Sequence, residues 1–116
     1  MTTQEIAAMV AEIGVPYAYR QFTKATAQPP PFVCFYLDGS DNFAADDRVY
    51  QHVETLIVEL YTDTKDFALE ERVKAILDAH NLPWERQEFY LGDEQMNETV
   101  YTVDVLISPS NPVVTT

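Results

Sequence analysis

The sequence predicts an α+β fold: an antiparallel or mixed β-sheet of four to five strands, with two helices packed on one face. Two segments, near residues 3–14 and 67–80, space their apolar residues as amphipathic helices do. The other ordered segments alternate apolar and polar residues or form short apolar runs, which is typical of strands. Single helices therefore interrupt runs of strands in the order α-β-β-β-α-β-β, which indicates an α+β domain.

The first helix is expected over residues 3–14. Thr2 and Glu5 have the spacing of a capping box, which satisfies free backbone N–H groups at the start of a helix. Gly14 and Pro16 provide the stop, because glycine tolerates the left-handed cap conformation and proline cannot continue a helix. One stripe of this helix collects the apolar residues Ile6, Met9, Val10 and Ile13.

Two short strands joined by a proline-rich connector are expected next. Residues 17–22 are aromatic and roughly alternating, and residues 32–37 form a continuous apolar run. The three prolines at 29–31 favour an extended connector that offers no backbone donors to a sheet. Residues 38–47, with the sequence DGSDNFAADD, are expected to form a polar loop.

Residues 49–61 are expected to form one unusually long strand. Its length exceeds the roughly 3–10 residues of most strands in globular proteins. Because Gln51 and His52 are polar, the first half is expected to project beyond the main sheet as part of a hairpin arm. One face of the second half collects the apolar residues Leu56, Val58 and Leu60.

The second helix, residues 67–80, has the clearest helical pattern in the chain. Asn81 can adopt the left-handed cap conformation, and Pro83 blocks continuation of the helix. We expect the apolar stripe to be largely buried against the sheet. The stripe consists of Leu69, Val73, Ile76 and Leu77, with His80 at its end.

Two further strands are expected, at residues 84–91 and 99–107. In the second of these strands, one face collects Tyr101, Val103, Val105 and Ile107, and the other collects Val100, Thr102, Asp104 and Leu106. Residues 108–116 include two prolines and have little to pack against, so we expect a flexible C-terminal tail. The prediction is a single α+β domain over residues 1–107.

Composition and charge exclude several classes of function. The chain of 116 residues has 19 acidic and 7 basic residues, for a net charge of −12. This charge disfavours binding of nucleic-acid phosphates and of anionic membranes. No apolar run approaches the roughly 20 residues of a membrane span, and no signal peptide is expected. The single cysteine, Cys34, cannot form an internal disulfide, which suits a reducing compartment.

The sequence predicts no catalytic centre and no cofactor or metal site. Three glycines are too few for a phosphate-cradling loop or a dinucleotide fingerprint, and no cysteine or histidine pair has zinc spacing. The acidic loop 38–47 lacks the glycine and glutamate that an EF-hand needs at fixed positions, so a solvated loop is expected. His52 and Glu54 could supply half of a metal site, but a surface ion pair is the simpler interpretation.

Cys34 and His80 carry side chains that can be reactive, but both are expected to have structural roles. Cys34 lies within the apolar run 32–37, where a small buried side chain is expected rather than a reactive thiol. His80 ends the second helix, where an imidazolium would complement the negative end of the helix dipole. We therefore do not expect the protein to be an enzyme.

Aromatic residues are numerous on elements that otherwise look polar. Tyrosine and tryptophan are enriched at protein–protein interfaces, because they bury a large area and keep a polar group. The alternative is that most of them pack beneath the two helices. Oligomerisation is the leading inference, and the residues expected at an interface between subunits are Tyr50, His52, Tyr61 and Trp84.

From about Ile57 to Ile107 the chain resembles small structural proteins of long-tailed bacteriophages and prophages, in the tail terminator (tail completion) and head–tail joining family. The resemblance is one of pattern and order over a little under half of the chain. It consists of Val58-Glu59-Leu60-Tyr61-Thr62, Lys65-Asp66, a helix with Glu70, Val73 and Leu77, then Leu82-Pro83-Trp84-Glu85, Glu88-Phe89-Tyr90 and Tyr101-Thr102-Val103.

The resemblance implies a structural virion protein without enzymatic activity. Members of this family form a ring, commonly of six subunits, that caps the tail tube and then binds the head connector or neck protein. The expected location is the junction of head and tail in the virion, after assembly in the host cytoplasm. An acidic lumen would repel phosphates, so DNA could pass through the ring without specific binding.

Two alternatives remain open. The chain could be another tail-tube or neck subunit with a similar fold and a different partner. It could also be a small-ligand-binding or enzyme module built on a ferredoxin-like sheet. A ring assembly in solution would favour the structural readings, and a monomer with a deep apolar pocket would favour the ligand-binding module.

Overall fold

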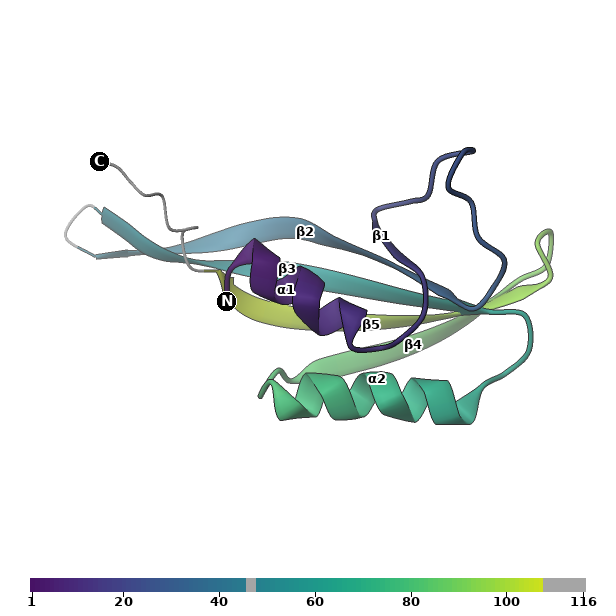
Figure 1. The fold of residues 1–116 in the computed structure, drawn as a ribbon. Coiled ribbons are helices and arrows are strands. Elements are labelled where there is room, and N and C mark those ends of the chain that lie inside the picture. The colour runs from purple at the N-terminus through teal and green to yellow at the C-terminus, as the bar shows by residue number, and fades with distance from the viewer. Residues whose placement is uncertain (46–47, 108–116) are drawn as a thin grey trace.

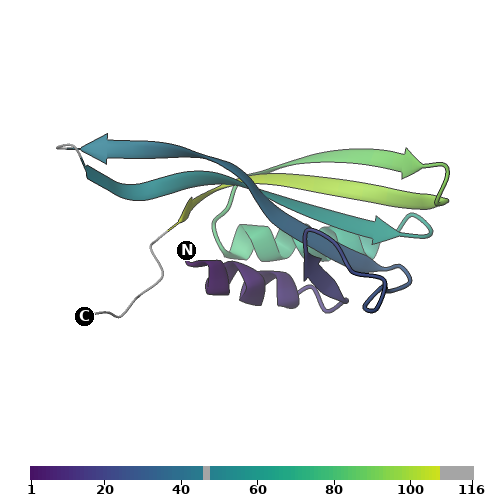
Figure 2. The same cartoon turned by 90° about the horizontal axis from the view of Figure 1, so that it is seen from above.

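The computed structural model of the chain describes the backbone of residues 1–45 and 48–107, and the side chains of 1–39 and 53–107. It has an α+β fold, as predicted, with two helices on one side of a mixed five-stranded sheet (Figures 1 and 2). The elements are α1 (Thr3–Ala11), β1 (Tyr17–Tyr19), β2 (Phe32–Ala45), β3 (Arg48–Thr62), α2 (Phe67–Ala79), β4 (Trp84–Leu91) and β5 (Met96–Ile107).

The strands lie in the order β1-β2-β3-β5-β4. β1 pairs with β2 in parallel, and the other neighbours are antiparallel. After α2, the chain enters the sheet at its outer edge as β4 and returns as β5, which pairs with β3. The two edges of the sheet are therefore formed by β1 and β4.

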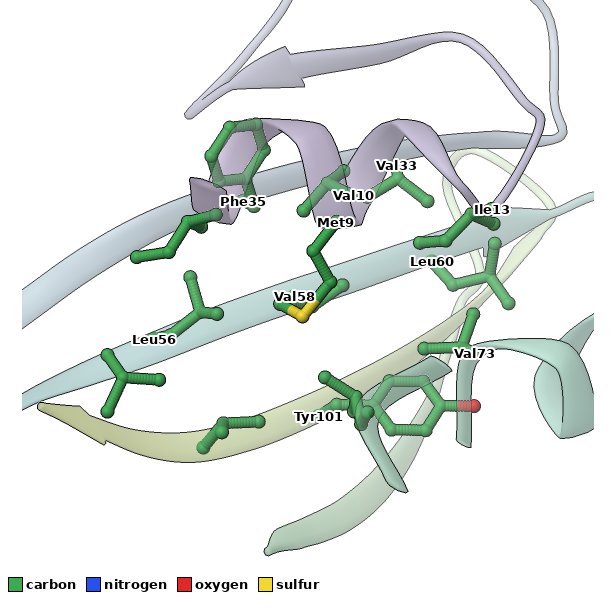
Figure 3. Close-up of a cluster of buried hydrophobic side chains, with 14 of the residues drawn as sticks. Met9, Val10, Ile13, Val33, Phe35, Leu56, Val58, Leu60, Val73 and Tyr101 are labelled. Carbon is green, nitrogen blue, oxygen red and sulfur yellow. The ribbon is translucent and has the colours of Figure 1, made fainter. Parts of the chain in front are cut away.

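The hydrophobic core lies between the helices and the sheet (Figure 3). The buried stripe of α1 packs against alternate residues of the central strands, and Val73 and Leu77 of α2 close the other end. The sheet residues in this core are Val33, Phe35, Leu56, Val58, Leu60, Tyr101, Val103, Val105 and Ile107. The predicted alternation of β3 and β5 is confirmed by these buried positions.

The capping box predicted for α1 is present, with Thr2 Oγ1 accepting from the Glu5 N–H and Glu5 Oε1 accepting from the Thr2 N–H. The helix ends at Ala11, three residues before the predicted boundary at Gly14. The chain then turns, and Gly14 has φ +88°, a left-handed conformation that favours glycine. Arg72 of α2 donates from Nη1 to the Ile13 carbonyl at 2.7 Å, which ties the two helices together.

The predicted strand at 17–22 is shorter than expected, because β1 ends at Tyr19. Arg20 has φ +68°, which turns the backbone out of the extended conformation. The prediction of a polar loop over residues 38–47 is wrong for residues 38–45, since β2 continues to Ala45 and pairs with β3, and residues 46–47 lie outside the described residues. In a two-stranded ribbon the backbone hydrogen bonds do not require an apolar side chain on either face, so hydrophobic patterning does not reveal this extension.

The long strand and its hairpin arm are confirmed. β3 spans 15 residues, but β5 accompanies it only from His52 to Thr62. Among the described residues, only β2 pairs with β3 beyond that point, so residues 43–45 and 48–51 form an arm of two strands that leaves the sheet (Figure 1). The molecule extends 50 × 30 × 24 Å.

The second helix matches its prediction to within one residue. The Asp66 side chain accepts from the Leu69 N–H at 3.0 Å, and Asn81 has φ +58° after the helix. Leu69, Val73 and Leu77 are buried. The fourth member of the predicted stripe, Ile76, is only partly buried.

The last two strands differ from prediction at one boundary. β4 covers residues 84–91 as expected, but β5 begins at Met96 rather than at residue 99. A tight turn over residues 92–95 makes the longer hairpin possible, and Gln95 adopts φ +54° there. The tail predicted at 108–116 lies outside the described residues.

Candidate self-association surface

The face of the sheet opposite the helices, called the open face here, lacks a helical layer (Figure 2). Its residues alternate with those of the core in the strand register. Its outer positions include Phe89 and Leu106, which are large apolar side chains left exposed. The described residues that form it include Phe32, Cys34, Tyr36, Val53, Thr55, Ile57, Glu59, Tyr61, Glu85, Gln87, Phe89, Glu98, Val100, Thr102, Asp104 and Leu106.

Two carboxyl groups and a phenol meet on the open face, where Tyr61 lies near the end of β3 and Glu98 near the start of β5. The Tyr61 hydroxyl oxygen lies 2.9 Å from Glu98 Oε2 and 3.1 Å from Glu59 Oε1. Burial, and then the negative charge of Glu98, raise the pKa of Glu59. Burial, and then the hydrogen bond to Glu98, raise the pKa of Tyr61. The phenol has a single proton to donate, so a proton on Glu59 would satisfy the second contact.

A hollow of about 360 Å³ opens beside this cluster, where the loop between β1 and β2 approaches the open face. Phe32 lies in its wall, stacked on Tyr61 at 4.9 Å between ring centroids, with the Phe22 ring edge-on to it at 5.4 Å. Cys34 also lines it, as a buried residue. Burial, and then the charges of Glu59 and Glu98, raise the pKa of the Cys34 thiol to about 11, so it is protonated at neutral pH.

The four predicted interface residues do not share one patch. Tyr61 belongs to the open face, whereas Trp84 pairs with Val103 on the helix side of the sheet. The indole N–H of Trp84 donates to Asp78 Oδ1 of α2 at 2.9 Å. The backbones of Tyr50 and His52 lie in β3, Tyr50 in the arm, but their side chains lie outside the described residues. The role of all four in an interface stays a prediction.

Exposed aromatic side chains gather at the two edges of the sheet. On β1, Tyr17 and Tyr19 are 43% and 52% exposed. On β4, Phe89 and Tyr90 are 48% and 64% exposed. Only two other large hydrophobic residues of the described chain, Phe67 and Leu106, are exposed in this way. The excess of aromatics noted in the sequence therefore lies mainly along the sheet edges.

His80 lies at the end of the second helix, as expected, and it contacts an acidic residue. His80 caps α2, and its Nε2 lies 3.0 Å from Glu12 Oε2 after α1. The other candidate, the pair His52 and Glu54, involves a side chain outside the described ones. Among the residues whose placement is described, no group of three or more His, Cys, Asp or Glu side chains is arranged to hold a metal ion.

A second hollow, of about 250 Å³, lies on the helix side between α1 and the β1–β2 edge. It is almost wholly apolar, with Ile6, Tyr19, Phe35 and Leu37 in its wall. Its lining includes no carboxylate, imidazole, thiol or amine, so it offers mainly shape and apolar contact.

Sequence reasoning missed the cluster of Glu59, Tyr61 and Glu98. The spacing of Glu59 and Tyr61 already places them on one face of a strand. The third member depends on the register between β3 and β5, which aligns Tyr61 with Glu98 across 37 residues of chain. Alternation within one strand cannot supply that register.

No helix among the described residues is both long and apolar enough to cross a membrane. Comparison of the chain with known protein families and with curated proteins finds no match.

Proposed function

We propose that the protein is a self-associating structural subunit of a long-tailed phage or prophage, which forms a ring that terminates the tail tube and joins it to the head connector. The observation that supports self-association best is the β2–β3 arm. Among the described residues, the two strands of the arm pair only with each other, so contacts outside the subunit explain the arm better.

The open face and the sheet edges support the same proposal. Exposed aromatic side chains on β1 and β4 provide contact area at low entropic cost. The arm and the edges lie on different parts of the subunit, so a contact between them joins unlike surfaces. Head-to-tail contacts of that kind close into rings when the rotation between subunits allows it.

The proposed partners are further copies of the chain, a tail-tube protein and a head connector or neck protein. The ring would sit at the head–tail junction of the virion, after assembly in the host cytoplasm. A net charge of −12 per subunit would keep DNA phosphates from adhering as the genome passes. No enzymatic step is part of this proposal.

Negative-stain imaging of the purified protein, alone and with tail tubes, tests the proposal. We expect rings, or caps at one end of each tube. A variant in which residues 42–52 are replaced by Asn-Gly retains the pairing of Asp41 with Val53 and removes the arm. It should fold and fail to form rings, whereas the exposed-site control Glu71→Ala should form them.

The same imaging experiment also distinguishes a tail terminator from a neck subunit and from a ligand-binding module. Binding to connectors without binding to tubes would favour a neck subunit. A monomer that binds neither would contradict the proposal. It would favour instead a ligand-binding module, for which the apolar hollow beside Phe35 and Tyr19 is the physical basis.

A further inference from the structure

The charge of the subunit is distributed unevenly between the two edges of its sheet. From Ile13 to Leu37 the chain has no acidic residue, although 19 occur elsewhere. This segment includes β1 and the loop that follows it, with Arg20 and Lys24 as its two cations. Both side chains are exposed, and neither forms an ion pair with a described residue. Arg20 lies over the Tyr36 ring, 4.7 Å from its centroid.

The opposite edge is acidic. Residues 84–98, which make up β4, the turn and the start of β5, include five acidic residues and one basic residue. Glu88 is compensated within the subunit by Lys65 and Arg86. Asp93 and Glu94 in the turn are exposed, and neither forms an ion pair with a described residue.

The basic β1–β2 loop and the acidic β4–β5 turn lie at similar positions along the long axis of the molecule. Figures 1 and 2 place the β1–β2 loop and the β4–β5 turn at the same end of the long axis, on opposite edges of the sheet. Next to each loop lies a pair of exposed aromatic residues, Tyr17 and Tyr19 on one edge and Phe89 and Tyr90 on the other. Side-by-side copies could therefore bring unlike charges and two aromatic pairs together at once.

We propose that the β1 edge of one copy docks against the β4 edge of the next, with Arg20 and Lys24 facing Asp93 and Glu94. This inference rests on the proposed function and adds a contact between sheet edges to the contact that the arm makes. Aromatic contact supplies the buried area, and the charges fix the direction, because like edges would bring like charges together. Such a contact is head-to-tail and leaves one free edge at each end until a ring closes.

Salt weakens the long-range repulsion between subunits more than it weakens the ion pairs at the edge contact. Repulsion between subunits of −12 acts over tens of ångströms and is screened at about 0.1 M salt, where the Debye length is about 10 Å. Contact pairs about 4 Å apart are screened much less. The edge contact should therefore be strongest at moderate ionic strength.

Charge reversal on each edge tests the proposal. Arg20→Glu with Lys24→Glu moves the net charge from −12 to −16, because each reversal changes it by two. Asp93→Lys with Glu94→Lys moves it to −8 by the same rule. Sedimentation velocity near 0.1 M salt should find at least tenfold weaker self-association in both variants. A 1:1 mixture should restore assembly, since each reversed edge then meets an edge of opposite sign.

The −8 variant distinguishes edge docking from a general charge effect. If only net charge mattered, this variant would associate more tightly than the wild type. The control Gln4→Lys, Ala8→Lys and Glu71→Lys also reaches −8, on exposed helix positions, and should associate at least as well as the wild type. Normal assembly by both edge variants, or no rescue on mixing, would overturn the inference and leave the ring proposal standing. A wild type that stays monomeric would overturn both.

Discussion

At the scale of single residues, the structure contains two carboxylates in contrasting surroundings. Glu59 shares the open face with Glu98 and forms no ion pair with a described residue, so burial and repulsion favour its protonated form. Glu70 is buried at 4% exposure on the helix side, but Lys65 Nζ lies 2.8 Å from it and Arg86 Nη1 3.4 Å. The two cations therefore compensate the buried charge of Glu70, whereas burial and the charge of Glu98 oppose ionisation of Glu59.

The Glu59 carboxyl should make stability fall as pH rises. Its pKa in the folded state is raised above the ordinary value of 4.5, so the native state binds the proton more tightly than the unfolded state. The stability due to the protonated form is complete below about pH 4.5 and is lost as pH rises through the raised pKa. Glu59→Gln, which resembles the protonated form, should remove this part of the pH dependence.

The measurement is the free energy of unfolding by urea for both proteins between pH 4 and pH 8. The wild type minus the Gln variant isolates Glu59 from groups such as Glu88, whose pKa is lowered by hydrogen bonds to Lys65 and Arg86. Glu88 acts in the opposite direction, because its contribution to the stability of the folded state is lost as pH falls. A difference that does not change with pH would contradict the prediction.

Removal of both cations around Glu70 should be strongly destabilising. Lys65→Met with Arg86→Met leaves a buried carboxylate without a compensating charge, which costs about 3–5 kcal/mol. Adding Glu70→Gln removes the uncompensated charge and should recover most of that loss. Chemical denaturation of the double and triple variants checks this. Equal stability of the two would contradict the prediction that Glu70 carries an uncompensated buried charge in the double variant.

At the scale of the elements, α2 owes its position to one apolar stripe. Leu77 is 2% exposed and packs in the cluster shared with α1 and the sheet. Polar contacts then tie the helix to the segment after α1, with the Arg72 bond to Ile13 at mid-helix and the His80 contact with Glu12 at the C-terminal end. Apolar burial supplies the energy, and these contacts fix the orientation.

Leu77→Ala should cost about 2–5 kcal/mol, because it removes buried methyl groups and leaves a cavity between helix and sheet. Glu71→Ala on the exposed side of the same helix is the matched control, and should change stability by less than about 0.5 kcal/mol. Thermal and urea unfolding of both variants provide the comparison. If Leu77→Ala changed stability by less than about 0.5 kcal/mol, the helix would not pack through this stripe.

At the scale of the whole molecule, charge and shape act on association in opposite directions. The arm and the aromatic edges offer contact area, while a net charge of −12 repels every copy from every other. The range of that repulsion is set by the Debye length, which falls from about 30 Å at 0.01 M salt to about 10 Å at 0.1 M. Association should therefore depend on the ionic strength as well as on the concentration.

We expect a monomer or weak oligomer in dilute protein at low salt, and a shift toward rings when salt or tail tubes are added. Sedimentation velocity across a series of salt and protein concentrations measures this directly. A single monomeric species throughout, with no binding to tubes, would contradict the ring proposal.

Local sequence patterns were enough to predict the elements whose formation depends on burial. The stripe of α2, the alternation of β5 and the capping box at Thr2 could all be predicted, because each is a local pattern with a fixed period or spacing. The length of β3 and the projection of the arm followed from the same kind of argument, since polar residues replace apolar ones where the strand leaves the sheet.

Which strands are neighbours, and in which register, could not be predicted from such patterns and is seen in the fold. Pairing of β3 with β5 brings Glu98 to Tyr61, and the outer position of β4 places the acidic turn opposite the loop with Arg20. The polar half of β2 was misread as a loop because its backbone pairs with β3 without an apolar face. Local periodicity reports burial, whereas register, edges and charge separation arise from contacts between residues far apart in the chain.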